Sequence, residues 1–165
     1  MSRKIVGRFA AGALIASTVL IAGAQPAGAA PPDSDITLPA GLACSDFDLR
    51  LQSTDSNTHT KTFKNGRTIA AGRGAVLTFT NLTTNESLTI QSHGSVSKTT
   101  PNGDGTNTVQ ATGHNVIILF PTDVPAGPST ILYVGRIVYT VSANNDFVVQ
   151  NTSGKQTDIC AQLAP

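Results

Sequence analysis

A strict alternation of apolar and polar residues constrains the fold of this chain more than any other feature. Phe47, Leu49 and Leu51 alternate with polar residues, and Leu77 and Phe79 do the same. A period of two places the apolar side chains on one face of a β-strand, and no stretch has the 3.6-residue period of an amphipathic helix. The pattern therefore predicts strands and argues against a helical core.

The longest strand candidates lie in the second half of the chain. Val116–Phe120 is a continuous apolar run, which suits a strand covered on both faces. Ile131–Val141 is the longest candidate, and Phe147–Val149 follows it after the turn Ala143–Asp146. Asn65-Gly66 is a further hairpin turn.

Composition agrees with this pattern, because residues 30–165 contain 21 Thr, 10 Val and 8 Ile, all of them β-branched. We predict an all-β fold, in which residues 42–163 form a single antiparallel meander that closes as a barrel or a coiled β-sandwich. An immunoglobulin-like sandwich is the alternative, although its buried Trp and its mid-domain cysteine spacing are absent.

The N-terminus has the parts of an export signal. Arg3, Lys4 and Arg8 form a positive region, and residues 9–22 form an apolar stretch that is too short for a stable membrane anchor. We expect a signal peptide over residues 1–29, a Pro-rich linker over 30–41 and a secreted, extracellular protein without stable membrane insertion after cleavage.

The charge of the chain argues against partners that bind through clustered positive charge. After removal of residues 1–29 the chain keeps 8 basic and 10 acidic side chains, and no run of Lys or Arg stands in the sequence. Nucleic-acid binding and adhesion to an anionic membrane need clustered basic residues. The sequence therefore predicts no nucleic-acid partner, and it leaves an envelope or extracellular component as a possible one.

The two cysteines bracket the predicted domain. Cys44 opens it and Cys160 nearly closes it. In an exported chain two cysteines usually pair, and a reactive pair would need close spacing or a basic neighbour. We predict a structural Cys44–Cys160 disulfide.

One hairpin contains the candidate site. The composition of Pro101–Thr106 is typical of a hairpin turn. If this turn is centred between Gly103 and Asp104, it joins two antiparallel strands, one over residues 86–99 and one over residues 106–120. This register pairs Val96 with Ala111, Gly94 with Gly113 and His93 with His114. Facing glycines indicate a shared bend.

Opposed residues on paired strands are close enough for His93 and His114 to share a metal ion. Such a site needs further ligands, for which His59 or Asp48 is available, although no spacing requires either. The alternative is a stacked or solvent-facing histidine pair. We name His93 and His114 as candidate metal ligands, and we predict no catalytic residue and no cofactor.

Motifs of catalysis are absent from the sequence. It has no Gly-x-Ser-x-Gly elbow and no glycine-rich phosphate loop, and Glu86 is the single Glu for a carboxylate pair. We expect a non-enzymatic binding or interaction domain at the cell envelope or in the medium. The alternative is a metal-dependent or hydrolytic enzyme that uses the cross-strand histidine pair.

Four segments, Ala43–Leu49, Asn65–Arg67, Leu77–Leu82 and Asp158–Ala161, together resemble small secreted proteins of unknown activity from high-GC Gram-positive bacteria. The resemblance covers about residues 42–163. It implies export and one disulfide-closed β domain, and it transfers no catalytic or binding residue.

Overall fold

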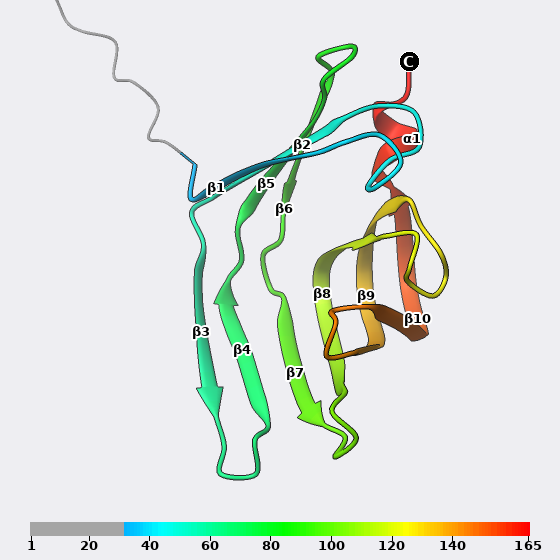
Figure 1. Cartoon of the computed structure of the whole chain (residues 1–165). Helices are drawn as coiled ribbons and strands as arrows, with labels where there is room; N and C mark the ends of the chain where they lie inside the picture. Colours follow the sequence, from blue (N-terminus) through cyan, green and yellow to red (C-terminus); the bar gives the residue numbers. More distant parts are fainter. Residues whose placement is uncertain (1–31) are drawn as a thin grey trace, which may run out of the picture. The chain divides into compact units, whose positions relative to one another are not determined.

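The computed structural model describes residues 32–165, which form ten strands and one short helix. The strands make two antiparallel sheets, one in the order β1-β2-β5-β6 and one in the order β10-β9-β8-β7-β4-β3 (Figure 1). The predicted all-β antiparallel class is confirmed. These sheets form a sandwich rather than a closed barrel, and their strand orders are not those of an immunoglobulin domain. The predicted signal peptide lies outside the described residues.

The elements are β1 (Ser34–Leu38), β2 (Leu49–Thr54), β3 (Asn57–Thr62), β4 (Thr68–Arg73), β5 (Val76–Asn81), β6 (Ser87–Gln91), β7 (Val96–Pro101), β8 (Asn107–Leu119), β9 (Ser129–Val141), β10 (Phe147–Asp158) and α1 (Ile159–Leu163).

Three segments of the chain supply one strand to each sheet. β2 continues into β3, β4 into β5 and β6 into β7, after interruptions of only a few residues. The register holds across the first interruption, because Thr54 pairs with Val76 in one sheet and Asn57 pairs with Arg73 in the other. The predicted strand over residues 86–99 is therefore two strands, β6 and β7, which lie in different sheets.

A row of glycines bends the strands β8, β9 and β10. Gly113 pairs with Gly135, which pairs with Gly154, and all three have positive φ angles of 89°, 142° and 96°. A Cβ atom on any of them would lie less than 3.0 Å from a backbone carbonyl oxygen, which belongs to Gly94 of the β6–β7 turn for Gly113 and to the neighbouring strand for Gly135 and Gly154. Only glycine fits this combination of conformation and close approach.

The bend brings the two ends of these strands together. A straight strand as long as β8 would span about 40 Å. Yet Val124, in the loop that follows the end of β8, forms a bridge with Val148 at the start of β10. Backbone hydrogen bonds hold this contact, from Val124 N to Phe147 O and from Val149 N to Val124 O.

Two apolar clusters cover β8 on opposite faces. Val116 and Ile118 pack with Phe79 and Leu49 of the four-stranded sheet. The alternate residues Ile117 and Leu119 belong to a second cluster, together with Ala111, Tyr133 and Ile137. The prediction of a strand covered on both faces is thus confirmed for Val116–Leu119, whereas Phe120 lies beyond β8 and is 36% exposed.

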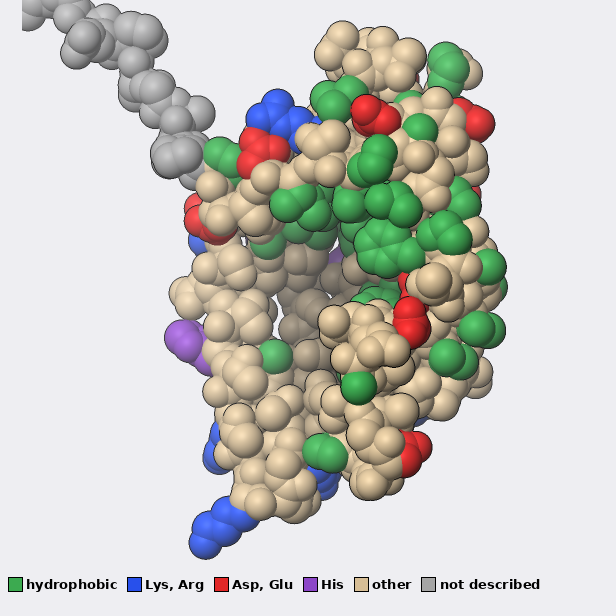
Figure 2. Space-filling model, viewed as in Figure 1, with side chains coloured by type: hydrophobic (Ala, Val, Ile, Leu, Met, Phe, Trp, Pro, Cys, Tyr) green, Lys and Arg blue, Asp and Glu red, His purple; other side chains and the backbone are tan. Residues whose placement is uncertain are grey.

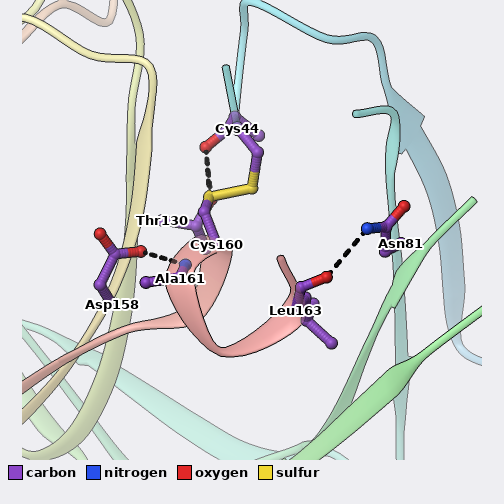
Figure 3. The surroundings of a disulfide bond; sticks show 8 residues. Cys44, Asn81, Thr130, Asp158, Cys160, Ala161 and Leu163 are labelled. Atoms are coloured by element: carbon purple, nitrogen blue, oxygen red, sulfur yellow. Dashed lines mark hydrogen bonds between the residues drawn. A yellow bond between two sulfur atoms is a disulfide. The ribbon is translucent and has the colours of Figure 1, made fainter. Parts of the chain in front are cut away.

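A disulfide joins Cys44 and Cys160, as the sequence predicted, with their Cα atoms 5.5 Å apart (Figure 3). Asp158 caps α1 by accepting a hydrogen bond from Ala161 N, and Leu163 O accepts one from the buried Asn81 amide. These contacts attach the C-terminus to the four-stranded sheet.

The predicted linker over residues 30–41 contains a strand. Residues Ser34–Leu38 form β1, which pairs with β2 along its whole length. Asp35 accepts hydrogen bonds from Arg50 and Gln52 of β2, and Arg50 lowers the pKa of the Asp35 carboxyl group. The short period-two run Ile36-Thr37-Leu38 is the only local signal for this strand, and three prolines surround it.

The predicted register of the β7–β8 hairpin is wrong by one residue. Val96 pairs with Thr112 rather than with Ala111. The turn is centred on Asp104, whose carboxylate accepts hydrogen bonds from Thr106 N and Thr106 Oγ1, while Asn102 N donates to Thr106 O. The loop therefore has an odd number of residues, whereas the predicted centre between Gly103 and Asp104 required an even number. This shift of one residue changes which side chains lie on the same face of the sheet.

Candidate functional site

The strongest candidate site is an apolar cleft at the border of the two sheets. Its volume is about 390 Å³, within the usual range of small-molecule sites. Figure 2 shows hydrophobic side chains gathered in the upper centre of the visible face, beside a hollow. The cleft is lined by Ile36 and Leu38 of β1, residues 116–118 of β8, Phe120 and Asp123 of the β8–β9 loop, Tyr139 of β9, and Asn145 and Phe147 around the β9–β10 turn.

One wall of the cleft is the edge strand β1. Ile36 is 47% exposed, which is unusual for a large apolar residue on a paired strand, and Leu38 beside it is only partly buried. Both side chains line the cleft. The wall therefore presents apolar surface to water.

Asp123 holds the opposite wall in place. This carboxylate is only 4% exposed, and its two oxygens accept hydrogen bonds from Phe120 N, at 2.5 Å, and Phe147 N, at 2.6 Å. One side chain thus connects the β8–β9 loop to the start of β10. Because both oxygens are occupied by backbone donors, Asp123 has a structural role in the cleft.

Asp123→Ala is expected to lower the free energy of unfolding by about 2–4 kcal/mol, because it leaves two backbone N–H groups without a charged acceptor. Asp123→Asn is the matched control, since it keeps one acceptor oxygen and should lose about half as much. Urea unfolding of the two variants measures the difference. Equal and small losses for both variants would contradict the structural role.

Tyr139 supplies a polar group at the same cleft. Its ring is partly buried and stacks at 5.1 Å from the ring of Phe147, and burial raises the pKa of its hydroxyl group. No hydrogen bond joins this hydroxyl to another residue of the described chain. A tyrosine hydroxyl in an apolar site usually has a partner, so Tyr139 can bind a polar group of a ligand.

The histidines named from the sequence do not assemble into a site. His93 is exposed in the turn between β6 and β7, outside any strand pairing, whereas His114 lies on β8 opposite Val134. His59 is exposed on β3, and Asp48 accepts a hydrogen bond from Ala40 N. Within residues 32–165 no three His, Cys, Asp or Glu side chains are placed to hold a metal ion. The predicted direct pairing of His93 with His114 is therefore wrong.

Sequence reasoning missed most residues of the cleft. Ile36 and Leu38 fall in the predicted linker, Phe120 falls at the end of a predicted strand, and Asp123 falls in a segment without a prediction. Tyr133 and Tyr139 lie an even number of residues apart in the candidate strand Ile131–Val141, a pattern more typical of core lining than of ligand contact. That interpretation is right for Tyr133, which is 4% exposed, whereas Tyr139 lines the cleft.

No family model, no curated protein and no solved structure matches this chain. Among the described residues, no helix is long and apolar enough to cross a membrane.

Proposed function

We propose that this protein is a secreted, non-enzymatic binding module whose apolar cleft takes a small molecule with an apolar body and one hydrogen-bonding group. We further propose that it acts at the bacterial cell envelope or in the medium, as the resemblance to small secreted bacterial proteins implies. The observation that carries the proposal is the cleft itself, an apolar space with Tyr139 among its lining residues.

The size of the cleft favours a small molecule over a protein segment. A volume of about 390 Å³ lies near the lower end of the range for small-molecule sites. Apolar walls formed by β1 and β8 supply binding energy through burial, and a single polar partner fixes the orientation of the ligand. The predicted export signal and the disulfide support the proposed secreted location.

Binding of N-phenyl-1-naphthylamine tests the proposal. This uncharged dye has an apolar body and a single N–H group, and its fluorescence rises in an apolar site. We expect saturable binding to the native protein, and we expect Ile36→Glu to raise the Kd at least about tenfold, because it places a charge on an apolar wall. Tyr139→Phe should raise the Kd about threefold to tenfold, since it removes only the hydroxyl group.

Leu82→Glu is the matched control. Leu82 is also a large apolar residue, 40% exposed, but it lies in the β5–β6 turn and does not line the cleft. This variant should bind the dye like the unmodified protein. Absence of dye binding, or equal loss in Leu82→Glu and Ile36→Glu, would overturn the proposed site.

A further inference from the structure

The positive charges of the described chain gather on the six-stranded sheet. Residues 32–165 contain eight Lys and Arg residues, and Arg50 alone belongs to the four-stranded sheet, where it forms an ion pair with Asp35. The other seven lie on strands of the six-stranded sheet or in its β3–β4 turn. They are Lys61, Lys64, Arg67, Arg73, Lys98, Arg136 and Lys155.

Strand register places four of these residues on one face. Lys61 of β3 pairs with Ile69 of β4, which pairs with Lys98 of β7. Directly paired residues point to the same face of a sheet, so the two lysines flank Ile69. Since neighbouring strands lie about 4.8 Å apart, the backbones of Lys61 and Lys98 are about 10 Å apart.

Arg136 lies on the same face, in the neighbouring set of cross-strand paired residues. It pairs with Thr112 of β8, which pairs with Val96 of β7, two residues from Lys98. Arg73 of β4 lies on this face as well, opposite Asn57. Over the paired residues of β3, β4, β7, β8 and β9 within the described chain, this face contains no Asp or Glu. We call it the basic face.

A shallow cavity of about 270 Å³ lies on the basic face between Lys98 and Arg136. Its other lining residues are Val96, Gln110 and Thr112. Gln110 Oε1 accepts one hydrogen bond from Arg136 Nη2, at 3.3 Å, which orients the guanidinium group and leaves its other donors free. No carboxylate neutralises either cation of this cavity, so both are available to an anion.

We propose that the basic face binds a linear polyanion that carries phosphate or sulfate groups. The cations are spaced across four strands rather than gathered around one point, and such spacing fits successive charges along a chain better than a single anion. The planar guanidinium of Arg136 offers paired donors to one oxyanion, and Lys61 and Lys98 supply point charges to its neighbours. Ile69 and Val96 form an apolar floor between them.

The sequence did not reveal this face, because its cations are far apart along the chain. More than thirty residues separate Lys61 from Lys98, and more than thirty separate Lys98 from Arg136. They become neighbours only through the pairing of the strands β3, β4, β7, β8 and β9. The chain as a whole has nearly balanced charge, so the segregation of charge arises from the fold. This proposal is independent of the apolar cleft.

Titration of the purified protein with long-chain inorganic polyphosphate at several salt concentrations tests the proposal. We expect binding at low salt that weakens as salt rises, because the polyanion releases its counterions. Lys98→Gln and Arg136→Gln should each weaken binding about threefold to tenfold and reduce the salt slope by about one. The triple variant with Lys61→Gln should lose at least about thirtyfold.

Arg50→Gln is the matched control, since it removes one Arg from the four-stranded sheet and should leave polyphosphate affinity unchanged. The side chains changed in these variants are all at least partly exposed; they belong to Arg50, Lys61, Lys98 and Arg136. Urea midpoints equal to that of the unmodified protein will therefore show that the variants fold. Dextran sulfate in a parallel titration distinguishes sulfate from phosphate, and binding of either polymer through the basic face supports the proposal.

Absence of binding at low salt overturns the proposal, as does a loss of affinity in Arg50→Gln equal to that in Arg136→Gln. Tenfold tighter binding of single-stranded DNA of matched charge would replace it with a nucleic-acid site.

Discussion

Gly113→Ala is expected to lower the free energy of unfolding by about 2–5 kcal/mol, one of the two largest effects in this protein. Two costs add at this position. A φ of 89° is a strained conformation for alanine. A Cβ atom there would also lie less than 3.0 Å from the carbonyl oxygen of Gly94, which is backbone and cannot turn aside. Urea unfolding monitored by circular dichroism measures the change.

Gly94→Ala separates the two costs. Gly94 also has a positive φ, 74°, but no atom lies within 4 Å of the position that its Cβ would occupy. This variant should lose only the conformational part, about 1–2 kcal/mol. Similar losses in the two variants would show that close packing at the glycine row contributes nothing, and no loss in either would refute the bend.

Removal of the disulfide is expected to cost about 4–5 kcal/mol, because Cys44 and Cys160 are 116 residues apart and their bond restricts a long loop of the unfolded chain. The double variant Cys44→Ala/Cys160→Ala should therefore unfold at a much lower urea concentration. Cys160 lies in α1 and Cys44 in the loop between β1 and β2, so α1 and this loop should lose protection from hydrogen exchange first.

Treatment with a reductant provides the control. Dithiothreitol should destabilise the unmodified protein and leave the double variant unchanged. Peptide mapping without reduction should find the Cys44 and Cys160 peptides linked. Two alkylatable thiols in protein recovered from culture medium would show that the bond is not part of the native molecule.

Local patterns in the sequence were sufficient to predict most strands. Ile131–Val141 falls within β9, and Leu77 and Phe79 are centred in β5, because alternation of apolar residues reports directly which side chains a sheet buries. The pairing of the two cysteines was predictable from their number and from the expected export signal. The proximity of Gly94 and Gly113 was also predictable, since only glycine tolerates their conformations.

Features that depend on distant pairing were not predictable from the sequence. The residues 86–99 divide between two sheets, although nothing local marks β6 and β7 as separate except the turn at Gly94. Register in the β7–β8 hairpin depended on the number of residues in the turn around Asp104, and His93 is left outside the hairpin because β7 begins only at Val96.

The sequence by itself thus determined the all-β class, the position of most strands and the disulfide, because each of these follows from local periodicity or from chemistry within a few residues. Tertiary structure alone decided the two candidate sites. The cleft needs β1 beside β8, and the basic face needs Lys61, Lys98 and Arg136 on neighbouring strands. Side chains of residues far apart in the chain become neighbours only through strand pairing and the bend at the glycine row, and no local pattern encodes which strands will pair.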